Sequence, residues 1–161
     1  MKRILLFDID STLVETIYDK DWDPIIPTLS EVYEKPISLD GVDARKFQGG
    51  TAQSIIGEML RANGLSITEH PEKLAKTFAL WMEKTEEYLK SKKMSFNPLP
   101  NVGNMLEYCR KSGYFDLALV TGNPIEMAEL KLRYAGIDPE IFKREYDGKL
   151  QLIGAFGNDH S

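Results

Sequence analysis

Two short apolar runs, each followed at once by polar residues, constrain the fold of this chain more than any other feature. Ile4–Phe7 and Leu117–Val120 contain only hydrophobic side chains. Strands of a parallel sheet that are covered on both faces have this continuous apolar pattern, whereas a strand with one face in water alternates. We therefore expect both runs to be buried strands of one parallel sheet.

The segment between the two runs is patterned as helices. From about Asp21 to Lys93, apolar residues recur at helical spacing. One helix is expected to begin after Thr51, a preferred N-cap residue, and to stop at Gly64. A longer helix is expected to begin near Pro71. Its apolar stripe consists of Leu74, Phe78, Trp81, Met82, Thr85 and Leu89.

The pattern changes after Asn97–Pro100, which we expect to be a hinge-type connector because each proline disfavours the helical conformation for the residue before it. A helix ending at Gly113, the second apolar run, a helix ending at Gly136 and a weaker strand over Leu150–Phe156 are expected in that order. This order predicts an α/β fold, a Rossmann-like parallel sheet core with an all-helical insertion after its first strand. The expected boundaries are 1–15 and 97–161 for the core and 16–96 for the helical insertion.

Composition excludes several classes of protein. No apolar run approaches the roughly 20 residues that a membrane-spanning helix needs. A net charge of −5 argues against a general nucleic-acid binder, which would have a basic face for phosphates. The single cysteine, Cys109, excludes an internal disulfide and suits a reducing compartment. We therefore expect a soluble cytoplasmic protein that does not act on nucleic acid or membranes; its acidic charge does not exclude a small phosphorylated substrate.

The polar residues after the two runs are the candidate site, because ligands of open α/β sheets bind beyond the carboxyl ends of the strands. Asp8 and Asp10 follow the first run, and Thr121–Asn123 follow the second. Two converging carboxylates repel unless a cation or a shared proton lies between them, and hard oxygen ligands favour Mg²⁺. One carboxylate could attack phosphorus while the other exchanges protons, with a hydroxyl holding the phosphate. Alternatively, an aspartate-rich turn after a strand is only a loop.

Longer strings of sequence favour the first interpretation. Leu5–Leu13 resembles the first motif of the haloacid dehalogenase-like superfamily, a hydrophobic strand followed by D-x-D-x-T. Leu117–Asn123 resembles the second motif, a hydrophobic strand that ends in Thr or Ser. The helical insertion resembles the cap of members similar to phosphoglycolate phosphatase and β-phosphoglucomutase. Leu99–Val102 is similar to the re-entry from cap to core in those members, so the resemblance covers essentially the full chain.

The resemblance implies a role for each matching residue. Asp8 would be the nucleophile and would bind the metal through its side chain. Asp10 would be the acid/base, with its backbone carbonyl also on the metal. Thr121, with Gly122 beside it, would bind the phosphoryl group during its transfer. Ser11 stands where most members have glycine, and a small residue there is expected to allow the same turn.

The third and fourth motifs are harder to place. Lys131 is the nearest candidate for the third-motif cation that steadies the nucleophile and phosphate, with Lys143 and Lys149 as weaker candidates and a plain surface lysine as the alternative. The fourth motif should bring further acids to the metal. Asp159 lies only 38 positions after Thr121, which is short for this family. We therefore expect the chain to stop before the fourth motif, with Asp159 filling it as the alternative.

The function that the resemblance implies is Mg²⁺-dependent hydrolysis of a small phosphate monoester, a phosphorylated metabolite such as a phosphoglycolate-like compound or a sugar phosphate. The presence of Asp10 favours a phosphatase or a phosphomutase, because relatives that cleave carbon–halogen bonds or pump ions lack the second aspartate. A phosphomutase, or a catalytically weak phosphate-binding or regulatory protein on the same fold, are the alternatives. Arg45–Thr51 could reach a second anionic group of the substrate, or could be a plain basic loop.

Overall fold

The computed structural model describes residues 2–19, 24–40, 42, 47, 49–68 and 71–143. Contacts divide the chain into two compact units. The sheet unit is Met1–Ile17 with Ser95–Ser161, and the helical unit is Tyr18–Met94. The boundaries expected from the sequence lie at 15/16 and 96/97, and the units divide at 17/18 and 94/95.

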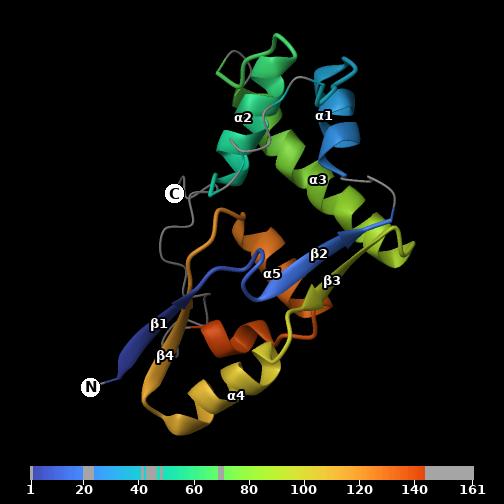
Figure 1. The fold of residues 1–161 in the computed structure, drawn as a ribbon. Coiled ribbons are helices and arrows are strands. Elements are labelled where there is room, and N and C mark those ends of the chain that lie inside the picture. Colours follow the sequence, from blue (N-terminus) through green and yellow to red (C-terminus); the bar gives the residue numbers. More distant parts are fainter. Residues whose placement is uncertain are drawn as a thin grey trace. The chain divides into compact units, whose positions relative to one another are not determined.

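The sheet unit contains a parallel pair of strands, β1 (Arg3–Phe7) and β4 (Phe115–Leu119), which Figure 1 shows side by side. In their register Leu5 lies opposite Leu117, and Phe7 lies opposite Leu119. Both strands therefore end at the same edge of the sheet, and the residues that follow them emerge together. The predicted fold class, an α/β protein with a parallel sheet, is confirmed.

The expectation that both apolar runs are covered on both faces holds for Leu117–Leu119 and is wrong for β1 and for Val120, which is 37% exposed. Leu117, Ala118 and Leu119 are at most 5% exposed. Ile4 and Leu6 are 54% and 52% exposed. Among the described residues, β1 has a single strand neighbour, β4. An apolar run shows that side chains are hydrophobic, but it does not show what covers them.

Glycines end the helices of this unit where the sequence predicts. Helix α4 (Val102–Ser112) ends at Gly113, and α5 (Ile125–Tyr134) is followed by Gly136. Both glycines have a left-handed backbone, with φ of +67° and +72°, which costs other residues about 1–2 kcal/mol. The 3₁₀ helix η2 (Pro139–Phe142) follows α5 and places the fully buried ring of Phe142 6.2 Å from that of Phe7, edge to face.

A second two-stranded sheet, formed by β2 (Val14–Tyr18) and β3 (Met94–Pro98), was not predicted. Asn97 and Pro98, expected in a connector, are the last residues of β3. Met94 and Phe96 are buried, whereas the serine between them is only partly covered. This alternation over a few residues was the available signal, but it is too short to stand out beside a long helix.

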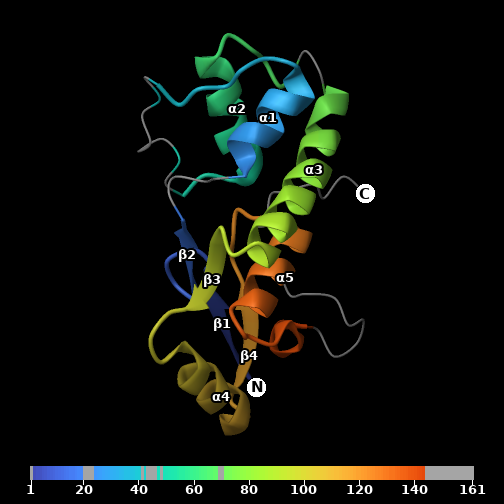
Figure 2. The ribbon, with the colours of Figure 1, turned by 90° about the vertical axis from the view of Figure 1, so that its right-hand side faces the viewer.

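The helical unit consists of α1 (Ile25–Tyr33), α2 (Ala52–Ala62) and α3 (Pro71–Lys90), and α1 packs against α3 (Figure 2). As predicted, Thr51 caps α2, and its hydroxyl oxygen accepts the N–H of Ser54 at 3.2 Å. Although α3 has 20 residues, its polar face is charged, and none of the helices in the described ranges is both long and apolar enough to cross a membrane. The buried core of this unit includes Leu29, Val32, Ile56, Met59, Leu60 and Phe78.

Candidate active site

The chain leaves β1 through a tight turn that is anchored by two fully buried side chains, Ile9 and Leu13. The carbonyl oxygen of Ile9 accepts the N–H groups of residues 12–14 at 3.3, 2.9 and 2.9 Å. Asp8 and Asp10 flank Ile9 and are exposed. Because burial of Ile9 and Leu13 holds the backbone of the turn, the two carboxylates are presented at the edge where the sheet ends.

Ser11 shows why this turn favours glycine. Its φ is +61°, in the left-handed region, and its N–H donates to the carbonyl of Val14 at 2.9 Å. A residue with a Cβ adopts this conformation at a cost of about 1–2 kcal/mol, and glycine avoids that cost. The turn is therefore formed with serine in the conformation that glycine would adopt freely.

The second strand end places polar side chains in the interior. Sheet pairing continues one residue beyond β4, where the N–H of Val120 donates to the carbonyl of Phe7 at 2.8 Å. Thr121 and Asn123 follow, and they are 4% and 7% exposed. The Thr121 hydroxyl oxygen accepts the backbone N–H of Asn123 at 3.2 Å and its Nδ2 at 2.7 Å. Since a hydroxyl oxygen has two lone pairs, both are used, and the hydroxyl proton is left to donate.

Lys131 joins the two strand ends from α5. Its Nζ donates to Asp10 Oδ1 at 2.6 Å and to Asn123 Oδ1 at 2.9 Å. Asn123 Nδ2 donates to the other Asp10 oxygen, Oδ2, at 2.6 Å. Lys131 is 9% exposed, and its ammonium lies 5.9 Å from the centre of the Phe96 ring. We call the connected set Asp10, Thr121, Asn123 and Lys131 the strand-end network.

The network partly changes the expectation for Lys131. From the sequence, Lys131 was expected to steady Asp8 and the phosphate, whereas its hydrogen bonds in the structure go to Asp10 and Asn123. Asp8 Oδ1 accepts the N–H of Ile9 at 2.7 Å, and Asp8 is not hydrogen-bonded to any member of the strand-end network. An exposed carboxylate beside a buried cation network leaves oxygen atoms of Asp8 open to solvent or to a substrate.

The other residues expected at the site contribute less or fall outside the described ranges. Gly122 lies between Thr121 and Asn123 and is partly exposed. Because glycine has no side chain, only its backbone can bind a ligand. Lys143 pairs with Glu140 at 2.6 Å on η2. Lys149, Asp159 and the weaker strand expected over Leu150–Phe156 lie outside the described residues, as do Arg45, Lys46 and Gln48 of the Arg45–Thr51 loop.

Asn123 is the member of the network to which sequence reasoning gave no role of its own. It was recognised only as one of three polar residues after the second strand. The sequence feature that could have indicated its role is its position two residues after Thr121, at the end of a strand. A short turn there directs the side chains of both residues toward the same edge of the sheet. Spacing alone does not reveal that the amide contacts Asp10, which lies 113 positions away in the sequence.

The oxygen atoms that could bind a metal at this edge of the sheet suit Mg²⁺, although they are few. Both side-chain oxygens of Asp10 accept hydrogen bonds, which leaves its backbone carbonyl and the Asp8 carboxylate as oxygen donors. In the described ranges, no cluster of three or more His, Cys, Asp and Glu side chains could hold a metal ion. Two protein oxygens still fit Mg²⁺, because this ion keeps several waters and takes further ligands from substrate phosphate.

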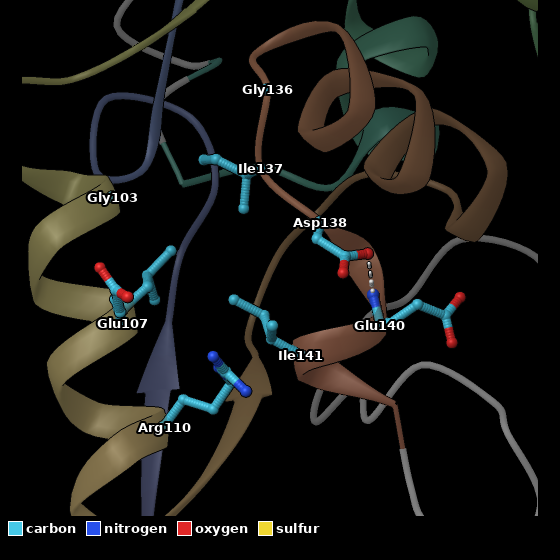
Figure 3. A pocket seen from close by; sticks show the side chains of 9 residues that line it. Gly103, Glu107, Arg110, Gly136, Ile137, Asp138, Glu140 and Ile141 are labelled. Atoms are coloured by element: carbon cyan, nitrogen blue, oxygen red, sulfur yellow. Dashed lines mark hydrogen bonds between the residues drawn. The ribbon is translucent and has the colours of Figure 1, made fainter.

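A pocket of about 580 Å³ lies apart from these residues, between α4 and the segment from Gly136 to Ile141 (Figure 3). Glu107 and Arg110 line it from α4, and Asp138 accepts the N–H of Glu140 on its other side at 3.0 Å. No member of the strand-end network lines this pocket. Its charges are mixed and do not favour a ligand of either sign, so we assign no role to it.

The comparison with protein families agrees with this geometry. The model of a family described as haloacid dehalogenase-like hydrolase matches residues 2–161. A search of curated proteins found no match. The match includes both strand ends, the helical unit and α5, and it confirms the resemblance at the level of the family. This chain belongs to the haloacid dehalogenase-like hydrolase family.

Proposed function

We propose that this hydrolase removes phosphate from a small phosphate monoester through an aspartyl-phosphate on Asp8. The observation that carries the proposal is the pair of aspartates after β1. Asp8 is exposed and outside the network, whereas Asp10, two residues later, is held by Lys131 and Asn123. One carboxylate is thus open to a substrate, and the other is fixed beside it, as a nucleophile and an acid/base require.

In the first half-reaction, an oxygen of Asp8 attacks phosphorus and the bond from phosphorus to the ester oxygen breaks. The leaving alkoxide takes a proton from Asp10, which is protonated at this stage, and departs as an alcohol. Protonation matters because an alkoxide is a poor leaving group. The products are the aspartyl-phosphate on Asp8 and a free alcohol.

In the second half-reaction, the Asp10 carboxylate removes a proton from water, and the water oxygen attacks phosphorus. The bond from phosphorus to Asp8 breaks, so that inorganic phosphate leaves and both aspartates return to their first state. Lys131 and Asn123 donate hydrogen bonds to the two side-chain oxygens of Asp10 and so keep this side chain in place for the step. Water is the acceptor in a phosphatase, whereas a phosphomutase would transfer the phosphoryl group to a hydroxyl of a sugar phosphate.

The remaining groups would bind the phosphate. The Thr121 hydroxyl, whose lone pairs are both used, has its proton available for a phosphate oxygen. The backbone N–H of Gly122 is a second donor at the same strand end. Mg²⁺, held by the Asp8 carboxylate and the Asp10 carbonyl, would neutralise charge on the transferring phosphoryl group.

The proposal is tested with p-nitrophenyl phosphate as the substrate, with Mg²⁺ and with EDTA in its place. We expect turnover only with the metal, and we expect Asp8→Asn to lower kcat by at least about 10³-fold. Asp40→Asn, which changes an exposed aspartate of the helical unit, is the matched control and should retain the parent activity. Radioactive phosphate should remain on acid-quenched parent protein and be absent from the Asp8 variant. Undiminished hydrolysis by Asp8→Asn would refute the assignment of the nucleophile.

A panel of substrates then separates the possibilities that remain. Release of inorganic phosphate from small phosphorylated acids or sugars supports a phosphatase. Interconversion of sugar phosphates without release of phosphate would show a mutase. Binding of phosphate without turnover of any ester would indicate a phosphate-binding protein on the same fold.

A further inference from the structure

We infer that Asn123 is a positioning residue, whose carboxamide orients the Asp10 carboxylate for proton transfer to the leaving group. This inference rests on the proposed function, because it assigns Asn123 to the acid/base of that reaction. The carboxamide contacts three functional groups at once: the Asp10 carboxylate, the Lys131 ammonium and the Thr121 hydroxyl.

The geometry uses both ends of the amide. Nδ2 has two hydrogens, and its two acceptors are Asp10 Oδ2 at 2.6 Å and Thr121 Oγ1 at 2.7 Å. Oδ1 accepts from Lys131 at 2.9 Å. The opposite orientation of the amide would place its oxygen against the Asp10 carboxylate and its NH₂ group against the Lys131 ammonium, and both contacts would be repulsive. The charges of the neighbours therefore determine which way the amide points.

No other side chain of similar size provides this combination. An aspartate cannot donate a hydrogen bond while ionised, and a leucine neither donates nor accepts. A serine is too short to join three partners. The requirement for two donors and one acceptor in a single planar group is met only by the amide of asparagine at this length.

Asn123 also restrains Asp10 in a direction that Lys131 cannot. The Asp10 side chain is 46% exposed, so its own burial does not fix its rotamer. Lys131 holds Oδ1, and Asn123 holds Oδ2, so rotation of the carboxylate would break one hydrogen bond or both. Asn123 is itself 7% exposed and is tied to Thr121 through its backbone and its side chain, so it forms a rigid support.

The test compares two substrates that differ in their need for a proton. p-Nitrophenolate is a stable anion that leaves with little help, whereas the alkoxide of glycerol phosphate needs protonation. We expect Asn123→Ala to lower kcat/KM for glycerol phosphate by roughly 10²-fold, and for p-nitrophenyl phosphate by less than about 10-fold. These kcat/KM values are the two rates to compare, because kcat also contains the second half-reaction, in which Asp10 acts on water whichever substrate was bound. Asp10→Asn should change the ratio of the two rates in the same direction and further.

The ratio of the two rates is the decisive quantity, because it does not depend on the fraction of protein that is folded. A structural defect lowers both rates equally and leaves the ratio unchanged. Asn104→Ala, at an exposed position in α4, is the control for the loss of an asparagine and should keep the parent ratio. Asn123→Asp, which keeps the size of the side chain but removes both side-chain donors, should alter the ratio at least as strongly as Asn123→Ala.

The outcomes separate this inference from the proposed function. If Asp10→Asn changes the ratio and both Asn123 variants leave it at the parent value, the inference is wrong and the proposed function stands. If the parent protein hydrolyses neither substrate, or if Asp8→Asn remains fully active, the proposed function fails and the inference fails with it. A changed ratio in both Asn123 variants, with the parent ratio in Asn104→Ala, supports the inference.

Discussion

The two units of this protein bury polar side chains in different ways. In the sheet unit, buried Thr121, Asn123 and Lys131 are bonded to one another and to Asp10, across up to 121 positions of sequence. In the helical unit, the buried polar side chains are satisfied locally or have no partner among the described residues. Thr28 and Thr77 donate to carbonyls four residues earlier, and the hydroxyls of Tyr33 and Thr85 are unpaired.

This difference supports the sheet unit as the location of the proposed site. The hydrogen bond of a threonine to a carbonyl of its own helix forms whenever that helix forms, and it holds no other segment in place. A network that joins a strand end, a second strand end and a helix needs the whole unit, and its buried lysine is costly unless every partner is present. The helical unit is thus organised by apolar packing, and the sheet unit is organised around a charged site.

The largest expected effects test whether the two units are separate in stability. Leu119 in the sheet unit and Leu60 in the helical unit are both fully buried, and each change to alanine should cost about 2–5 kcal/mol. Hydrogen exchange should become faster mainly in the unit that carries the substitution. Faster exchange throughout both units in either variant would mean that they unfold as one, and the comparison would then not extend to stability.

The next comparison sets two ion pairs against each other. Lys131 bonds to Asp10 with its side chain 11% exposed, whereas Lys84 pairs with Glu31 at 3.0 Å, with exposures of 22% and 56%. Lys131→Met should cost about 1.5–3 kcal/mol in urea unfolding, because it leaves Asn123 Oδ1 without a buried donor. Lys84→Met should cost about 0–1 kcal/mol. Equal costs would contradict the view that the strand-end network is the more tightly bound.

Substitutions at the C-terminal ends of two helices should have smaller effects on stability. Helix α4 ends at Gly113 with φ of +67°, and α1 ends at Glu34 with φ of +54°. Gly113→Ala should destabilise the protein by about 1 kcal/mol, and Glu34→Gly should stabilise it by up to about the same amount. Thermal unfolding measures both. If Glu34→Gly lowers stability, Glu34 must contribute a contact that outweighs the cost of its backbone conformation.

The smallest effect concerns the unpaired hydroxyl of Tyr33. Burial, and next the charge of Glu72, raise the pKa of Tyr33 above its ordinary value. Above about pH 10 the unfolded state therefore loses this proton before the folded state does, and the free energy of unfolding falls as the pH rises. Tyr33→Phe should change stability by less than about 1 kcal/mol at pH 7 and should show a weaker alkaline loss in urea unfolding. An unchanged alkaline loss would exclude Tyr33 as its source.

Much of the architecture could be predicted because its signals are local. Apolar runs located β1 and β4, glycines located the ends of α4 and α5, and Thr51 located the start of α2. The polar residues beyond the two strands were recognised as candidates because parallel strands end at one edge of a sheet. The short strands β2 and β3 were missed, because five residues contain too little periodicity to outweigh a helical neighbourhood.

The sequence by itself therefore determined the fold class and indicated that Asp8, Asp10 and Thr121 lie near one edge, with Lys131 as one of several candidate cations. Tertiary structure alone decided which atoms meet: Lys131 bonds to Asp10 in place of Asp8, and Asn123 joins the two strand ends. It also decided that Ile4 and Leu6 are exposed despite their apolar character. The physical reason is the same in each case, because patterning depends on neighbours in sequence, whereas hydrogen bonds and burial depend on distances between segments more than 100 positions apart.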